Sequence, residues 1–225
     1  MDNIDNINKK LSLDFLKYLF GDTYTDLTDI KLDNISVYSI TPRDQADIIT
    51  DVVKNYFGKK ITVTDMTACI GGNTISFAKD FEKINAIEIC KERFNFLKHN
   101  SEINKFNNIK FYLGDSIQVI KNLTQDVIFI DPPWLGKSYK YKKNINLFLS
   151  SIPIYDICND LYGKSKSIVL KIPKNFNIIK FNNKTLHSDI YLYEFKKINL
   201  LVLKNSEEEL TNHEINEKKY TVKKL

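Results

Sequence analysis

Hydrophobic positions follow two rhythms along the chain. Near the N-terminus they recur every three or four residues, which predicts an amphipathic helix over residues 8–20 followed by a polar loop over residues 21–34. Thr41 and Pro42 then open a second helix that runs to about residue 57, with the proline at its favoured first helical position. We place a small N-terminal helical extension at residues 1–36.

After residue 58 short apolar runs alternate with helical patterns. The runs predict strands at residues 61–66, 84–89, 109–113, 126–130, 167–172, 190–195 and 198–204. Predicted helices lie between them at residues 73–81, 91–105, 116–123 and 153–162. This order is typical of a doubly wound, Rossmann-like α/β sheet with helices on both faces. Over residues 37–204 we expect seven strands, the last of them antiparallel, and over residues 205–225 a flexible charged tail.

Composition narrows the class of protein. The 33 basic and 28 acidic residues give a net charge of +5, which favours an anionic partner but also fits a solvated lysine-rich surface. No apolar run approaches the roughly 18 residues of a membrane span. The scattered Cys69, Cys90 and Cys158 indicate neither a disulfide framework nor a metal site. We expect a soluble, intracellular monomer, in the nucleus or cytoplasm, with no metal and no membrane partner.

Acidic side chains end three successive predicted strands. Asp65 ends the first, Glu88 ends the second, 88 − 65 = 23 residues further on, and Asp115 follows the third. An acid at the position of Glu88 commonly accepts hydrogen bonds from ribose hydroxyls, and Asp115 could accept one from the adenine amine. Each acid alone could equally be a helix cap.

Between the first strand and its helix stands a loop with two glycines, Gly71 and Gly72. Its spacing is neither the dinucleotide fingerprint nor a Walker loop, so a smaller ligand is indicated. With the three acids, the loop favours S-adenosylmethionine as the cofactor. The loop residues that we assign to this site are Ala68, Gly71, Asn73 and Thr74.

The fourth predicted strand runs directly into Asp131, Pro132, Pro133 and Trp134. Because the prolines cannot donate hydrogen bonds to a sheet, the strand must stop there. An acid, rigid carbonyls and the chain's one tryptophan then lie at the edge where open α/β sheets bind ligands. Such acceptors can hold the hydrogens of a nucleobase amine while the ring stacks on the base. The alternative is a core tryptophan beside a tight turn.

An Asp-Pro-Pro-aromatic sequence resembles the motif of amino-methyltransferases. Residues 64–77 and 129–136, with residues 30–33 and 38–42, are similar to the trimethylguanosine synthase family, which methylates N2 of the 7-methylguanosine cap of RNA. The family's loop ends in Cys-x-Gly-Gly-Asn-Thr-Ile, as residues 69–75 do here. The resemblance covers roughly residues 30–204 and implies a class I methyltransferase that uses S-adenosylmethionine.

The resemblance also implies a role for each matched residue. Asp65, Gly71, Glu88 and Asp115 would hold S-adenosylmethionine, covered by Thr41 and Pro42, with Asp131 at the same site. Trp134 would stack on the cap base, Asn100 would read the guanine edge, and Tyr139 and Lys174 would contact the cap phosphates. The remaining substrate-binding assignments are Lys17 and Pro133, and the catalytic assignments are Asp131, Pro132 and Trp134.

Two departures from the family pattern keep alternatives open. Asp131 stands where the cellular family typically has serine, and residues 135–137 are Leu-Gly-Lys where the family has Gly-Gly-Pro. We predict an RNA cap guanine-N2 methyltransferase acting on capped RNA, in a minimal form as in a compact viral or protist genome; a viral enzyme would work in the viral factory. The alternatives are an adenine-N6 methyltransferase of RNA or DNA, and an inactive cap- or RNA-binding module.

Overall fold

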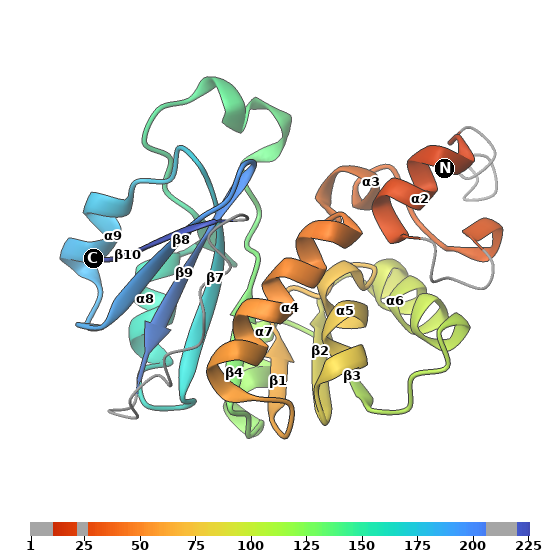
Figure 1. The fold of residues 1–225 in the computed structure, drawn as a ribbon, viewed down its shortest axis with the longest axis horizontal. Coiled ribbons are helices and arrows are strands. Elements are labelled where there is room, and N and C mark those ends of the chain that lie inside the picture. Colours follow the sequence, from red (N-terminus) through yellow and green to blue (C-terminus); the bar gives the residue numbers. More distant parts are fainter. Residues whose placement is uncertain (1–10, 22–26, 206–219) are drawn as a thin grey trace. The chain divides into compact units, whose positions relative to one another are not determined.

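The computed structural model of the chain describes residues 11–21, 27–205 and 220–225. Residues 8–10, where we expected the first helix to begin, lie outside these ranges. The chain divides into two compact units, residues 1–122 and residues 123–225. Figure 1 shows the alternation of strands and helices in each unit, and this alternation confirms the predicted α/β class.

The first unit carries three parallel strands, β1 (Thr62–Asp65), β2 (Lys83–Glu88) and β3 (Ile109–Leu113). Its longer helices are α2 (Leu13–Phe20), α4 (Arg43–Phe57), α5 (Gly72–Asp80) and α6 (Lys91–Ile103). Short turns of helix are η1 (Leu27–Asp29), α3 (Ser36–Ser39), α7 (Ser116–Val119) and η2 (Ile120–Asn122). The strands and the helices α4, α5 and α6 match the sequence prediction. Helix α2 begins at Leu13, so the predicted helical start ahead of Ser12 was wrong, and η1 and α3 were not predicted.

Helix starts follow local side-chain chemistry. The Ser12 side chain accepts a hydrogen bond from the Phe15 amide and so caps α2. Pro42 lies at the N-cap of α4 rather than at its first helical position. The difference is one residue, because the extended backbone of Pro42 places the first helical residue at Arg43.

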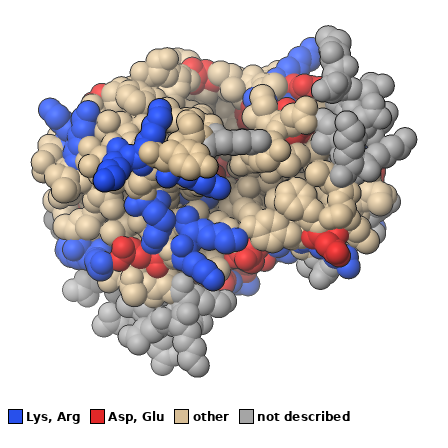
Figure 2. Space-filling model, turned by 90° about the horizontal axis from the view of Figure 1, so that it is seen from above, with Lys and Arg blue, Asp and Glu red and all other residues tan. Residues whose placement is uncertain are grey.

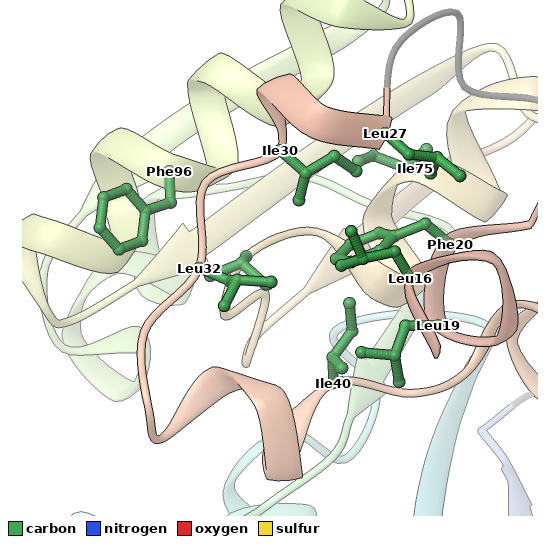
Figure 3. Packing of buried hydrophobic residues seen from close by; sticks show 10 residues of the cluster. Leu16, Leu19, Phe20, Leu27, Ile30, Leu32, Ile40, Ile75 and Phe96 are labelled. Carbon is green, nitrogen blue, oxygen red and sulfur yellow. The ribbon is translucent and has the colours of Figure 1, made fainter. Parts of the chain in front are cut away.

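The N-terminal extension shares a hydrophobic core with the elements around the glycine loop (Figure 3). Leu16, Leu19 and Phe20 from α2 belong to one buried cluster with Ile75 of α5 and Phe96 of α6. The other members are Leu27, Ile30, Leu32, Ile40 and Ile70. The predicted boundary at residue 36 marks a change in sequence pattern. The residues before and after it pack into one hydrophobic core.

The second unit carries the antiparallel part of the sheet. In it β4 (Val127–Ile130) pairs in parallel with β7 (Ser167–Pro173), which pairs antiparallel with β9 (Ile198–Lys204). Next along are β8 (Ile190–Glu194) and β10 (Thr221–Lys224), both antiparallel to their neighbours. The smaller elements are η3 (Gly136–Tyr141), β5 (Phe148–Leu149), β6 (Ile152–Pro153), α8 (Ile154–Asp160) and α9 (Ile178–Lys184).

The last strand corrects the sequence prediction. Among the described residues the first unit has three of the main-sheet strands and the second unit has five, where we expected seven in all, because β10 forms within the stretch interpreted as a flexible tail. The Tyr220 ring lies 5.3 Å from that of Tyr193 and 5.1 Å from that of Phe195, and this aromatic contact anchors the strand. Because residues 205–225 are rich in lysine, their composition did not indicate that an edge strand forms there.

The shared core predicts that α2 contributes to the stability of the first unit. Phe20→Ala removes a ring that is 2% exposed, so we expect it to lower the free energy of unfolding by about 3–5 kcal/mol. The measurement is urea denaturation followed by circular dichroism. Leu13→Ala is the matched control on the same helix, since Leu13 is 52% exposed, and should change stability by less than about 0.5 kcal/mol. Equal effects of both variants would refute the shared core.

Candidate active site

Asp65, at the end of β1, ties together the two ends of the glycine loop. One carboxylate oxygen accepts a hydrogen bond from the Thr67 amide at 3.1 Å. The other accepts one from the Thr74 hydroxyl at 2.7 Å, at the start of α5. Asp65 is fully buried, so both bonds are protected from water. The structure thus brings Asp65 and Thr74 together, while contact of either residue with a cofactor stays a prediction.

Glu88, at the end of β2, holds the middle of the same loop. Its carboxylate accepts hydrogen bonds from the amides of Cys69 at 3.0 Å and Cys90 at 2.8 Å. Cys69 has φ 51° and Gly71 has φ 108°, a left-handed stretch that lets the loop turn into α5. The Ala68 amide donates to the Ile87 carbonyl at 3.0 Å, which fixes the loop against β2.

The segment of residues 40–42 lies directly against the glycine loop. A Cβ atom on Gly72 would lie 2.7 Å from a side-chain carbon of Ile40 and 3.0 Å from the Thr41 carbonyl oxygen, so only glycine permits this approach. The Asn73 amide nitrogen donates to the Thr41 hydroxyl at 2.9 Å. The structure therefore places Thr41 and Pro42 beside the loop that the sequence assigns to the cofactor.

Arg93, which the sequence analysis did not select, joins two acids of this unit. Its guanidinium lies 3.6 Å from a Glu88 carboxylate oxygen and 3.3 Å from one of Asp33. Burial acts to raise the pKa of Asp33, but hydrogen bonds from Ser36 and the Arg93 charge together hold that pKa below its ordinary value. Arg93 thus links the segment around residue 33 to the acid at the end of β2.

Asn100 is fully buried and bonded to backbone. Its carbonyl oxygen accepts from the Lys31 amide at 2.9 Å, and its amide nitrogen donates to the carbonyls of Lys31 at 3.0 Å and Ile70 at 3.1 Å. In this structure Asn100 therefore fastens the chain around residue 31 to the glycine loop. Contact between Asn100 and a guanine edge remains a prediction.

Asp115 and Lys17, two further residues assigned to binding in the first unit, differ in their contacts. The Asp115 carboxylate accepts from the Ile117 amide at 3.0 Å and caps α7, the capping alternative raised from the sequence. Its contact with adenine remains a prediction. Lys17 is exposed on α2.

A glycine loop bordered by acids at two adjacent strand ends fits a small ligand that carries hydroxyl groups and an amine.

In the second unit, β4 ends at a buried ion pair. The Asp131 carboxylate lies 2.7 Å from the ammonium of Lys171 on β7, and the two side chains are only 12% and 7% exposed. They meet because β4 and β7 are parallel, with Ile130 beside Leu170. Sequence reasoning missed Lys171, although a lysine inside the apolar run of residues 168–172 is an unusual signal.

Trp134 is enclosed by polar and aromatic neighbours. The Lys171 ammonium lies 4.9 Å from the centroid of its ring, within range of a cation–π interaction. The Tyr139 ring lies edge-on at 5.3 Å, and burial raises the pKa of its phenol. The Trp134 ring nitrogen is buried without a hydrogen-bond partner among the described residues. Pro132 is buried and Pro133 exposed beside this ring.

Lys174 and its neighbour Asn175 bond to different parts of the second unit. The Lys174 ammonium donates to the Phe195 carbonyl and to the Asn199 side chain, both at 2.8 Å. An ammonium has three hydrogens, so it retains capacity for a further acceptor such as a phosphate oxygen. The next residue, Asn175, donates to the Tyr139 carbonyl at 2.7 Å.

Other chemistries find little support among the described residues. Burial, aided by the charge of Glu88, raises the pKa of the Cys69 thiol to about 12, so this thiol stays protonated and is a poor nucleophile. Within the described ranges, no cluster of three or more His, Cys, Asp and Glu side chains could hold a metal ion. None of the helices described is long and apolar enough to cross a membrane.

Comparison with known proteins places the fold and the family. The structure superimposes with a TM-score of 0.67 on one described as a methyltransferase of Porphyromonas gingivalis, over 93% of this chain and 54% of that chain, at 14% identity. Residues 60–221 match the family model of RNA cap guanine-N2 methyltransferases. The chain is thus a methyltransferase that uses S-adenosylmethionine. Because the family match spans most of the chain, the protein belongs to that family.

Individual relatives include a trimethylguanosine synthase, an RNA methyltransferase and an uncharacterized protein. An uncharacterized protein of Acanthamoeba polyphaga mimivirus is 29% identical, covering 81% of this chain and 82% of the relative. The trimethylguanosine synthase of Schizosaccharomyces pombe is 34% identical, over 50% of this chain and 49% of that protein. An uncharacterized RNA methyltransferase of Clostridium tetani is 29% identical over 69% of this chain. The chain spans about half of the yeast enzyme and 36% of the bacterial one.

The buried ion pair yields a prediction about stability. Lys171→Met leaves the Asp131 carboxylate without its ammonium, so we expect a loss of about 3–5 kcal/mol in the free energy of unfolding. Adding Asp131→Asn should restore most of that loss, because the buried charge is then gone. Urea denaturation of the two variants measures both values.

The control is Lys166→Met, which breaks the ion pair of Lys166 with Asp126 in the same unit. Those side chains are 44% and 32% exposed, so this change should cost less than about 1 kcal/mol. If Lys171→Met costs no more than the control, the pair is not a structural constraint.

Proposed function

We propose that this protein transfers a methyl group from S-adenosylmethionine to the exocyclic N2 amine of the 7-methylguanosine cap of RNA. The observation that carries the proposal is the corner after β4, where Asp131 and the Trp134 ring are fixed by one buried lysine. The family match and the yeast relative support guanine N2 as the acceptor. The mimivirus relative supports a viral origin, and hence action in a viral factory.

Methyl transfer to a nucleobase amine requires the protein mainly to position the amine and the methyl group. The amine of a nucleobase is a weak nucleophile, since its lone pair is delocalised into the ring, and the bound cofactor supplies an activated methyl group on a sulfonium. Asp131 and the carbonyls beside Pro132 would accept the amine hydrogens and turn its nitrogen toward that methyl. Transfer would break the S–C bond of the sulfonium and form an N–C bond, and the nitrogen would then release a proton to solvent.

The Asp131–Lys171 pair bears on the choice of base. With the ammonium 2.7 Å away, the carboxylate and the lysine together carry no net charge. Selection of the cationic 7-methylguanine base would then depend on stacking with the Trp134 ring rather than on an unbalanced carboxylate. A carboxylate keeps acceptor capacity beyond one ion pair, so Asp131 can still receive an amine hydrogen.

A second candidate is methylation of adenine N6, which the acid at position 131 favours because that residue is common among adenine-N6 enzymes. The two readings assign different substrates to the same corner. The cap reading requires a cationic base followed by phosphates, which Lys174 and Tyr139 would contact. The adenine reading requires neither the charge nor the phosphate tail.

One assay distinguishes these functions. The protein is incubated with methyl-labelled cofactor and, separately, m7GpppG, GpppG or an adenine-containing oligonucleotide. We expect transfer to m7GpppG, little to GpppG and none to the oligonucleotide. Transfer to the oligonucleotide alone would establish the adenine reading, and cap binding without transfer to any acceptor would establish a binding module.

Trp134 variants test the stacking role. Trp134→Ala should lower kcat/KM for m7GpppG about 10- to 100-fold, since stacking on an aromatic ring is worth about 1–3 kcal/mol per base. Cofactor affinity, measured by titration calorimetry, should change little. Trp134→Phe is the matched control: it keeps an aromatic face and sacrifices no hydrogen bond, because the ring nitrogen has no partner among the described residues. A large loss of cofactor affinity would contradict this role.

A further inference from the structure

Residues 140–143, at the end of η3 and just beyond it, form an exposed stretch with three lysines and no acidic side chain. Between Pro132 and Tyr155 the sequence contains no Asp or Glu. Lys140, Lys142 and Lys143 are all exposed, and none of the three pairs with a carboxylate among the described residues. Figure 2, which looks down on the side where this segment projects, shows Lys and Arg side chains gathered there with few acidic ones. The stretch attracts anions.

Tyr141 stands among these lysines and is 90% exposed. A tyrosine ring normally buries most of its apolar face, so a ring left in solvent provides a surface for stacking. Lysines beside an exposed aromatic ring are the combination with which proteins bind single-stranded nucleic acid, by charge along the backbone and stacking with the bases. The chemistry of the surface therefore indicates a single RNA strand.

The base of this segment is held in one shape. Asn175 donates to the carbonyls of Tyr139 and Lys142 at 2.7 Å and 2.6 Å. Residue 145 is fixed as well, since its amide donates to the Asn175 carbonyl at 2.9 Å and its carbonyl accepts from Asn177 at 2.9 Å. The backbone is thus pre-organised while the side chains of residues 140–143 extend into solvent, an arrangement that lowers the entropic cost of binding.

The segment begins at the aromatic corner. Tyr139 contacts the Trp134 ring at 5.3 Å, and Tyr141 follows only two residues later. In a 3₁₀ helix each residue advances about 2 Å, so a strand leaving a base stacked on Trp134 would meet Tyr141 within the first nucleotides. Resting on the function proposed above, we propose that Tyr141, Lys142 and Lys143 bind the nucleotides that follow the cap, so that the preferred substrate is a capped RNA strand.

The experiment compares two acceptors, the dinucleotide m7GpppG and a capped single-stranded RNA of twelve nucleotides. We expect the wild-type protein to have a kcat/KM at least tenfold higher for the capped RNA. The triple variant Tyr141→Ala/Lys142→Gln/Lys143→Gln should lose that advantage while its kcat/KM for m7GpppG stays within twofold. Lys180→Gln/Lys184→Gln, which removes two exposed lysines elsewhere in the same unit, is the control and should retain it.

A second measurement separates this proposal from the proposed function. The affinity for an end-labelled, uncapped RNA of the same length is measured by anisotropy, which requires no methyl transfer. The triple variant should bind at least fivefold more weakly than the wild type, with a shallower dependence on salt. If the wild-type protein methylates no cap but this difference holds, the function fails and the RNA surface stands. Equal affinities, or equal losses on both acceptors, would overturn the surface.

Discussion

The hydrogen bonding of the glycine loop is the constraint on which the first unit depends. A left-handed turn after β1 leaves several backbone groups without partners in a helix or strand, and neighbouring side chains satisfy them instead. Asp65 and Glu88 accept from loop amides, and Asn100 donates to a loop carbonyl. Because each partner comes from a different element, the loop keeps its shape only when the surrounding unit is folded.

The second unit depends on a different constraint, the burial of two opposite charges. A carboxylate at the end of β4 is costly to bury, and Lys171 one strand away offsets that cost. Asp131 and Lys171 are therefore best understood as one feature of this chain. The same ammonium lies against Trp134, so the charge pair also orients the ring.

The sequence alone predicted those parts of the fold that depend on local pattern. The strand run of residues 126–130 stops at the prolines, and the alternation of elements in the first unit follows apolar periodicity. The strand of residues 221–224 escaped prediction because its stability comes from pairing with β8 and from the Tyr220 contacts, which are remote in sequence. The roles of Lys171 and Arg93 were not predicted for the same reason, because their charged partners come close only in the folded chain.

Trp134 has a consequence beyond recognition. It is the one tryptophan among 225 residues, and it lies between a lysine ammonium and a tyrosine ring at the corner where a base would stack. Indole emission responds to nearby charge and to stacking, so the protein contains its own optical reporter. The tryptophan emission therefore originates at this corner and would respond to a base bound there, without a label.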